Sequence, residues 1–204
     1  MGLLDFFSGK KKVEKPEESR LFKTFFDQGR IEYESKDYHN AIEYFDKAIS
    51  EAEKTKVNLE KALVFKARSL DGLQRFNESQ QLFDRAFELK PEDSFTWYMR
   101  GLSFMEQGLI DKALKYFEKS FEINPFFEEP MLTAAAYYGK VGQYDRQAEC
   151  YQKILQNNPD SKRAGKLLQS LLDDRKKQLN RQWLGGITKG MKIRDGEDLK
   201  DSAQ

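Results

Sequence analysis

Few residues in this chain have the types and spacing that catalysis requires. The sequence has one histidine, His39, and one cysteine, Cys150, which lie far apart along the chain. A cysteine nucleophile needs a neighbouring base, and a structural zinc site needs about four Cys or His ligands, so neither site is indicated. No glycine-rich phosphate-binding motif occurs. We therefore predict no catalytic residues, no metal site and no cofactor, and we expect that the protein is not an enzyme.

The two reactive residues have ordinary structural explanations. His39 lies in the segment KDYHNA, which favours a turn or the start of a helix, and a pH-sensitive contact is the alternative. Cys150 lies in RQAECYQKI and is interpreted as a packed helix residue. The acidic residues alternate with lysines, which is typical of solvated helix faces with i,i+4 partners.

Composition narrows the class of protein further. The 204 residues fit one domain or one repeat array with end segments, and the 34% charged content favours thin layers with much surface. A net charge of +1 gives little counterion release, so we predict no nucleic-acid binding. A single cysteine indicates a reducing, cytoplasmic setting, and no apolar run is long enough for a transmembrane helix.

The N-terminal residues combine an apolar cluster with a basic run. We call residues 1–18 the head segment and expect it to be flexible, with Pro16 and mixed charges before the first helix. Its apolar and basic side chains could lie in a membrane interface, dock in the chain's own groove, or bind a partner. The candidate residues are Leu3, Leu4, Phe6, Phe7, Lys10, Lys11 and Lys12.

A fixed period organises the rest of the sequence. Pro91, Pro125 and Pro159 are each 34 residues from the next, and apolar residues between them recur at helical spacing. Each proline is expected to end the second helix of a two-helix unit, and Asp93 offers an N-cap for the next helix. Such a period predicts a stack of similar helix pairs.

The period gives the boundaries of the units. We predict repeats within 19–161, at 22–55, 60–93, 94–127 and 128–161, then a capping helix over 162–183 and a flexible tail over 184–204. Ala41 and its counterpart Ser79 are 38 residues apart, so about four extra residues lie between the first two units. A longer second helix or a wider turn would accommodate them.

The repeated residues resemble the tetratricopeptide repeat family. The unit WYMRGLSFMEQGLIDKALKYFEKSFEINP places Trp97, Gly101, Gly108, Phe117 and Pro125 at the family's spacing. The resemblance covers about residues 22–161 and implies an all-α, right-handed superhelical solenoid of four helix pairs with a C-terminal capping helix. It implies nothing about the ligand, because the repeated residues build the stack.

In this family the first helix of each unit lines a concave groove. Carried onto this chain, the resemblance implies an inner face that is basic near its N-terminal end and aromatic or methionine-rich further on, which suits capture of a peptide. The candidate partner-binding residues are Phe26, Arg30, Phe65, Arg68, Phe95, Tyr98, Met99, Leu102 and Leu132. The wider inward-facing set adds Lys23, Tyr33, Lys61, Met105, Thr133 and Ala136. The alternative is that these side chains pack only against neighbouring units.

One well-known subgroup of the family clamps the C-terminal carboxylate of a chaperone with Lys, Asn and Arg side chains. The matching slots here are Phe26, Arg30, Phe65, Phe95 and Met99, or, one unit later, Val64, Arg68, Met99, Glu129 and Thr133. Neither register supplies the clamp, so a chaperone tail is not the expected ligand. An RNA-binding array is also not indicated, since no polar nucleotide-reading code recurs on the inner face.

These observations favour a non-enzymatic scaffold that binds a peptide or helical segment of a partner protein in its groove. The alternative is a membrane-peripheral assembly factor tethered weakly by the head segment. The sequence leaves the oligomeric state open.

Overall fold

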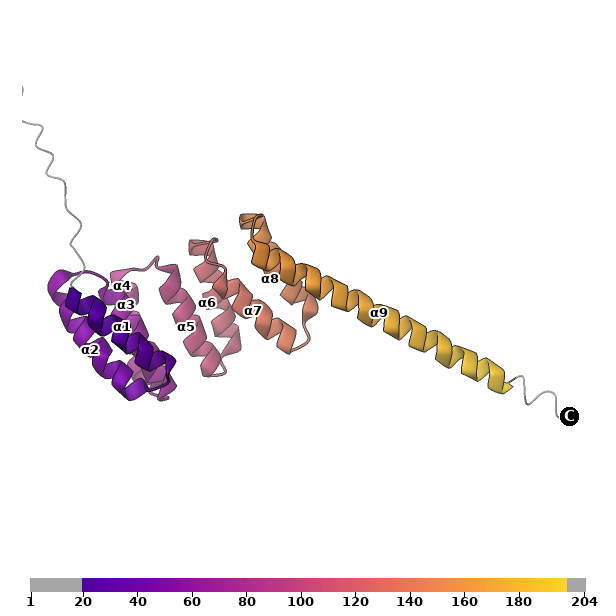
Figure 1. The fold of residues 1–204 in the computed structure, drawn as a ribbon, viewed down its shortest axis with the longest axis horizontal. Coiled ribbons are helices and arrows are strands. Elements are labelled where there is room, and N and C mark those ends of the chain that lie inside the picture. Colours follow the sequence, from indigo (N-terminus) through magenta and orange to yellow (C-terminus); the bar gives the residue numbers. More distant parts are fainter. Residues whose placement is uncertain (1–19, 198–204) are drawn as a thin grey trace, which may run out of the picture. The chain divides into compact units, whose positions relative to one another are not determined.

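The structure, a computed structural model, describes the backbone of residues 20–197 and the side chains of residues 20–182. Every regular element in this range is an α-helix (Figure 1). The helices are α1 (Arg20–Glu34), α2 (Tyr38–Thr55), α3 (Leu59–Gly72), α4 (Phe76–Leu89), α5 (Ser94–Glu106), α6 (Ile110–Ile123), α7 (Glu129–Lys140), α8 (Tyr144–Asn157) and α9 (Lys162–Glu197). The all-α helical-repeat fold expected from the sequence is therefore confirmed. The head segment lies outside the described residues.

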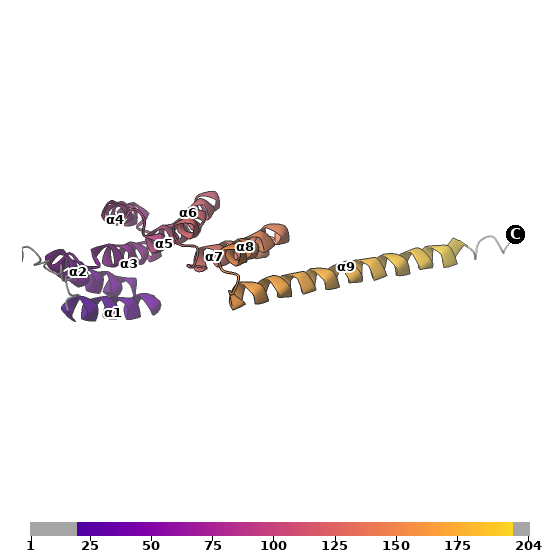
Figure 2. The same ribbon diagram turned by 90° about the horizontal axis from the view of Figure 1, so that it is seen from above.

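The chain divides into two compact units. Unit 1, Met1–Ile123, carries α1 to α6, and unit 2, Asn124–Gln204, carries α7 to α9. In unit 1, consecutive helices pack as antiparallel pairs, and α3 also contacts both α1 and α5, between which it lies in Figure 2. The first helices of the three pairs therefore form one layer of unit 1.

The prolines set the ends of three helices. α4, α6 and α8 end at Leu89, Ile123 and Asn157, in each case two residues before a proline. The residue before proline is driven away from helical backbone angles, so the helix must stop there. The Asp93 carboxylate then accepts hydrogen bonds from the Thr96 backbone N–H at 2.8 Å and the Thr96 hydroxyl at 2.6 Å. This N-cap confirms the helix start predicted at Asp93.

The four extra residues between the first two units extend a helix. α2 has 18 residues, whereas α4, α6 and α8 have 14 each. The segment has no glycine or proline to interrupt the helix, and α2 ends only where Lys56 takes a positive φ of 59°. A longer second helix, one of the two expected solutions, is the one the chain adopts.

The two helices of each pair approach closely where the first helix carries a glycine. A Cβ on Gly29 would lie 2.7 Å from the Phe45 ring, and one on Gly101 would lie 2.5 Å from the Phe117 ring. Phe45 and Phe117 are both fully buried. These glycines therefore allow the second helix to insert an aromatic ring against the backbone of the first.

The core of unit 1 is continuous from the first to the third helix pair. Its buried members include Phe22, Ala48, Leu63, Phe83 and Met99, and further aromatic side chains of α1, α3 and α5 pack on its edge. Together these side chains hold α1, α3 and α5 in fixed positions, and these are the helices that carry most of the predicted binding residues.

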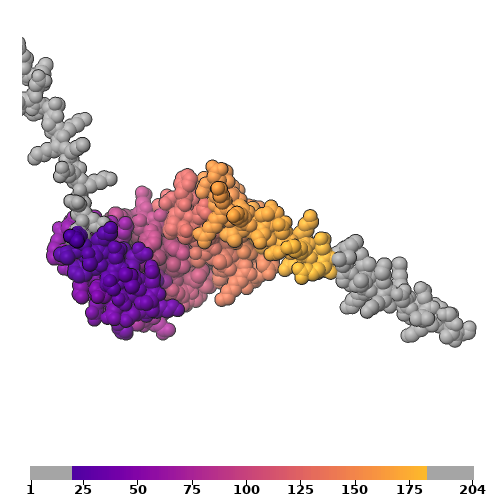
Figure 3. All heavy atoms as spheres, in the orientation of Figure 1, coloured from indigo at the N-terminus to yellow at the C-terminus, as the bar shows by residue number. Residues whose placement is uncertain are grey.

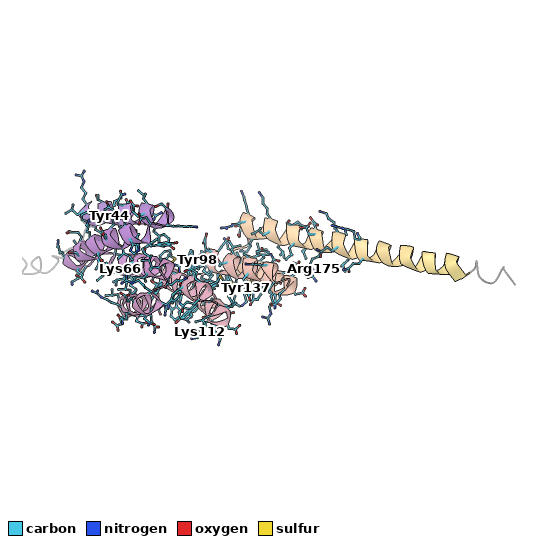
Figure 4. The ribbon with its side chains drawn as sticks, turned by 90° about the horizontal axis from the view of Figure 1, so that it is seen from below. Tyr44, Lys66, Tyr98, Lys112, Tyr137 and Arg175 are labelled. Carbon is cyan, nitrogen blue, oxygen red and sulfur yellow. The ribbon has the colours of Figure 1, made fainter. Side chains whose placement is uncertain are left out.

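Unit 2 differs from the expected end of the array. α9 packs on α8, and it is held further by the ion pairs Arg163–Glu129, at 3.4 Å, and Arg175–Asp145 (Arg175 is labelled in Figure 4). The helix begins where the predicted capping helix begins but continues to Glu197, through residues 184–197 that were predicted to be a flexible tail. No proline follows Pro159, and glycine lowers helix propensity without blocking the backbone hydrogen bonds.

The leucines of α9 are only partly covered. The sequence pattern of the predicted capping helix places Leu167, Leu168, Leu171, Leu172 and Leu179 toward the array, but Leu167, Leu172 and Leu179 are 39%, 48% and 64% exposed. α8 has 14 residues and α9 has 36. At about 1.5 Å per residue, α9 is roughly 33 Å longer than α8, so α8 can cover only part of α9.

Candidate partner-binding site

A pocket of about 410 Å³ opens on the layer formed by α1, α3 and α5. Four of the predicted binding residues line it: Phe26 and Arg30 from α1, Phe65 from α3 and Phe95 from α5. Tyr33, Glu34, Lys61 and Asp93 complete the lining. The helix spacing therefore brings side chains from three successive repeats into one site, all within unit 1.

Phe65 is the centre of the pocket wall. Its ring centroid lies 5.2 Å from that of Phe26, 5.8 Å from that of Phe95 and 6.0 Å from that of Tyr33. Edge-to-face and stacked contacts at these distances stabilise the rings in place, so the wall is preformed rather than assembled by a ligand. The rings are half-buried and line the pocket. A wall of this kind offers apolar area to an incoming side chain at little cost in entropy.

The charged side chains at the rim of the pocket differ in how strongly they are already paired. Arg30 and Glu34 pair at 3.2 Å, with side chains 48% and 66% exposed, and such a surface pair contributes at most about 0.5 kcal/mol. Asp93 is occupied as the N-cap of α5. Lys61 is exposed and has no ion pair among the described residues. The pocket therefore offers one uncommitted cation and one weakly held cation to a ligand.

Arg68 does not lie at this rim, although we expected it to face a ligand. Its side chain is 5% exposed, and its guanidinium donates to both carboxylate oxygens of Glu106, at 2.5 and 2.8 Å, and to Asp71 at 3.2 Å. Burial is the largest single effect and lowers the Arg68 pKa, but the Glu106 hydrogen bonds together with the Coulombic interactions with Tyr33, Glu106 and Asp71 raise the Arg68 pKa overall. The ion pair between Arg68 and Glu106 therefore links α3 to α5, and the Arg68 guanidinium is not available to bind a ligand.

Two neighbours of Arg68 have altered ionisation. Burial raises the pKa of the Tyr33 hydroxyl, and the positive charge of Arg68 offsets only part of this rise. Burial likewise raises the pKa of the Asp71 carboxyl, and Arg68 again offsets only part of it. Tyr33, which lines the pocket, is therefore a neutral phenol at neutral pH and adds no charge to it.

The remaining predicted residues are dispersed. Met99 is 7% exposed in the core of unit 1, and Tyr98, labelled in Figure 4, packs on Phe117 with ring centroids 5.7 Å apart. Leu102 packs on the edge of the same core. Leu132 is buried on α7 in unit 2. None of these four side chains lines the aromatic pocket.

Sequence reasoning did not single out Glu34 and Asp93 as pocket residues. Glu34 lies one helical turn after Arg30, which was among the predicted residues. The i,i+4 spacing could therefore have identified Glu34 as a neighbour of Arg30 at the pocket. Asp93 was assigned to capping, and its second position at the pocket depends on how α5 packs on α3. Tyr33 and Lys61 belonged to the wider inward-facing set.

The described residues offer little else for chemistry. His39 is exposed in the first turn of α2, and Cys150 is buried in α8, in the other unit. Among residues 20–182, no group of three or more His, Cys, Asp or Glu side chains could hold a metal ion. In the same part of the chain, no helix has the length and apolarity to cross a membrane.

Comparison with protein-family models gives three matches, all described as tetratricopeptide repeat. They cover residues 22–55, 60–93 and 94–127, which together make up half of the sequence. Two of the similar curated proteins are Hsp70-Hsp90 organizing protein 1 of Glycine max and Hsp70-Hsp90 organizing protein 3 of Arabidopsis thaliana. Each is 26% identical over 193 residues and 82% of this chain. The chain spans only about a third of the length of these relatives, at 32% and 33%.

Solved structures show the same architecture. A tetratricopeptide repeat protein from Parabacteroides merdae superposes with a TM-score of 0.53 at 16% identity, over 79% of this chain and 62% of that one. A structure of MamA gives a TM-score of 0.50, also at 16% identity, over 78% of this chain and 91% of that one. Identities this low support the fold alone.

Proposed function

The chain belongs to the tetratricopeptide repeat family, and on that premise we propose that it is a non-enzymatic scaffold that binds a segment of a partner protein in the aromatic pocket of unit 1. One observation carries the proposal: Phe26, Phe65 and Phe95, from three successive repeats, line a single open pocket of about 410 Å³. Preformed, mainly apolar concave sites with a few polar groups at the rim are the usual sites of ligand capture. A cytoplasmic location is part of the same proposal.

The chemistry of the pocket defines the partner segment. The aromatic wall favours a large apolar side chain, which would bury most of its area between the rings of Phe26, Phe65 and Phe95. Lys61, which has no ion pair within residues 20–182, and the weakly paired Arg30 favour an acidic residue beside that anchor. Arg68 already pairs with Glu106 and Asp71. We therefore propose that the acidic residue of the partner contacts Arg30 on α1 and Lys61 on α3.

The names of the curated relatives concern Hsp70 and Hsp90, but a chaperone C-terminal tail is not the partner we propose. The slots that would clamp its carboxylate carry Phe26, Arg30, Phe65, Phe95 and Met99. Three of these side chains are aromatic, and Met99 is buried in the core. At these five slots a free terminal carboxylate would meet one arginine and three aromatic rings and none of the lysine or asparagine groups of the clamp, which favours an internal hydrophobic segment instead.

The test compares charge reversals at the rim with a matched reversal elsewhere. We expect Lys61→Glu and Arg30→Glu to reduce the recovery of co-purifying partners several-fold, because each places a like charge opposite the acidic residue of the partner. Lys119→Glu, on the exposed face of α6, is the control and should leave recovery unchanged. Partners are identified by affinity purification and mass spectrometry, with circular dichroism to show that all variants are folded. Equal recovery with every variant would exclude the pocket as the binding site.

The head segment supports a second candidate, a membrane-peripheral assembly factor. The sequence places Leu3, Leu4, Phe6 and Phe7 directly before Lys10, Lys11 and Lys12, a combination that suits an anionic membrane surface. Flotation with phosphatidylserine-containing liposomes distinguishes this candidate. The full chain should float with the vesicles and a chain without residues 1–12 should not. If the full chain stays at the bottom of the gradient, the tether is excluded.

A further inference from the structure

The chain carries, in its own head segment, a short sequence whose chemistry matches the aromatic pocket. Residues 3–7 read LLDFF, with one acidic residue among four large apolar ones. We propose that this segment occupies the aromatic pocket of the same chain when no partner is bound, so that the protein guards its own binding site. This inference rests on the same pocket as the proposed function, and it adds which segment fills that pocket when no partner is bound.

The apolar match is the first argument. The pocket wall consists of Phe26, Phe65 and Phe95 with Tyr33, and its volume of about 410 Å³ lies at the low end of the range for small-ligand sites. A site of this size takes one or two large side chains and not the face of a folded domain. Phe6 or Phe7 is such an anchor, and aromatic pairs at centroid distances of about 4.5–7 Å are favourable beyond the area they bury.

The charges match as well. Asp5 directly precedes the phenylalanines, and the pocket rim presents Lys61 without an ion-pair partner among the described residues. The lysine run that begins at Lys10 follows the anchors, and Glu34, which also lines the pocket and pairs weakly with Arg30, is 66% exposed. One orientation of the segment therefore satisfies both signs of charge. Such pairs are weak individually but select that orientation.

The length of the intervening chain permits this contact. Twelve residues, 8 to 19, separate Phe7 from Arg20, where α1 begins, and when extended they reach about 40 Å. Phe26 lies six residues after Arg20, about 9 Å along the helix. A tether this short gives an effective concentration of about millimolar, so even a modest intrinsic affinity fills the pocket. Figure 3 shows the indigo atoms of the N-terminal part of unit 1, where α1 begins, at the surface of that unit.

The experiment uses the full-length chain with one nitroxide label. Ser8→Cys in a Cys150→Ala background places the label beside the proposed anchors, and paramagnetic broadening of the backbone amides is measured by NMR. Amides near Arg20 will broaden in any case, because the tether begins there. The diagnostic amides are those around Phe65 in α3 and Phe95 in α5, which we expect to lose most of their intensity. The matched control carries Phe6→Ser and Phe7→Ser on the same tether and should restore them.

A charge swap tests the proposed orientation. Asp5→Lys or Lys61→Glu alone should lower the ratio of docked to undocked head by roughly two- to fivefold, and the two together should recover it. Unchanged broadening at Phe65 and Phe95 in the Phe6→Ser, Phe7→Ser control would overturn the proposal. Broadening that arises only between labelled and unlabelled chains in a mixed sample would assign the pocket to a second copy. Broadening that requires anionic vesicles would assign the head to a membrane surface. Each of these two results also overturns docking within one chain.

Partner recovery distinguishes this inference from the proposed function. If the head guards the pocket, a chain without residues 1–12 should recover several-fold more partner than the full chain. Intensity loss at Phe65 and Phe95 without any recovered partner would support self-docking and reject the scaffold function. Recovery of a partner without intensity loss at Phe65 and Phe95 would support the scaffold function and reject docking of the head segment.

Discussion

At the scale of single residues, the turn between the two helices of each repeat requires left-handed backbone. Gly108 and Gly142 adopt φ of 74° and 77° there, and the equivalent residues of the first two repeats, Lys36 and Gln74, adopt 65° and 60°. A residue with a Cβ pays about 1–2 kcal/mol for this conformation, which glycine adopts freely. The first two repeats therefore close their turns under strain that the last two avoid.

Replacing Gln74 by glycine should stabilise the protein. We expect the free energy of unfolding to rise by about 0.5–1 kcal/mol, because relief of backbone strain exceeds the extra entropy that glycine gives the unfolded chain. Gln80→Gly, at an exposed position within α4, is the matched control and should lower it by up to about 1 kcal/mol. Urea unfolding of both variants measures the difference. A loss of stability in Gln74→Gly would show that the turn is not strained.

Asp71 gives a pH-dependent prediction at the same scale. Burial raises its pKa above the ordinary value of 3.8, so the folded state binds a proton more tightly than the unfolded state does. The stability that Asp71 contributes is therefore complete below the unfolded-state pKa and is lost as the pH rises through the folded-state pKa. Asp71→Asn has no such loss. We expect the stability of Asp71→Asn relative to wild type to improve from pH 3.5 to pH 7, as measured by urea midpoints at each pH.

The residues that the sequence misplaced share one cause. Arg68 and Met99 occupy inward-facing positions of their helices, and the periodic pattern identified those positions correctly. Whether a side chain at such a position is exposed to a ligand depends on the neighbouring helix. Glu106 on α5, 38 residues after Arg68, accepts a hydrogen bond from the Arg68 guanidinium and neutralises its charge. Contacts between repeats at this separation leave no periodic signal in the sequence, whereas Phe26, Phe65 and Phe95 were singled out because each is an aromatic residue on the first helix of its repeat.

At the scale of helices, the sequence predicted most of the fold because the signals were local. Prolines, the Asp93 cap and apolar spacing identified the helix pairs, and the continuous polar segment after Ala52 allowed the extension of α2. The end of α9 was mispredicted for the same reason. Its glycines resemble a linker in composition, but the helix persists to Glu197 because nothing in that stretch blocks backbone hydrogen bonding.

The close approach of α5 and α6 makes Gly101 sensitive to a single methyl group. We expect Gly101→Ala to destabilise the protein by about 1–3 kcal/mol, because the new Cβ would lie 2.5 Å from the fully buried Phe117 ring. Gly165→Ala in α9, where a Cβ meets nothing within 4 Å, should instead stabilise by about 0.5–1 kcal/mol. Thermal and urea unfolding give both values. Equal effects at the two glycines would contradict the packing described between α5 and α6.

At the scale of the whole molecule, the two units differ in the size of their cores and in the sites that they contain. Unit 1 contains the continuous core and the complete lining of the aromatic pocket. Unit 2 contains a single helix pair and α9, with a smaller set of buried apolar residues around Tyr151 and Ile154. The proposed binding site and the larger buried core therefore lie in the same part of the chain. The right-handed superhelical twist implied by the family resemblance stays a prediction.

This division predicts how fragments behave. A chain of residues 1–123 should unfold cooperatively and retain partner capture, because its core and its pocket are both internal to it. A chain of residues 124–204 should be much less stable, since a small unit buries a smaller fraction of its surface. Circular dichroism melting and the same affinity purification measure the two properties. A fragment 1–123 that is unfolded in isolation would show that its stability depends on unit 2.

The long second helix of the first repeat limits how this protein could be rebuilt. The four added residues make slightly more than one helical turn and displace the next hairpin by about 6 Å along α2. A tandem duplication of residues 60–93 would insert one full 34-residue repeat and keep the helix spacing of the neighbouring repeats. A duplicated first hairpin would introduce the same offset a second time. Chimaeras that lengthen the array are therefore best joined after Pro91, and the first hairpin is best left as a unique leading module.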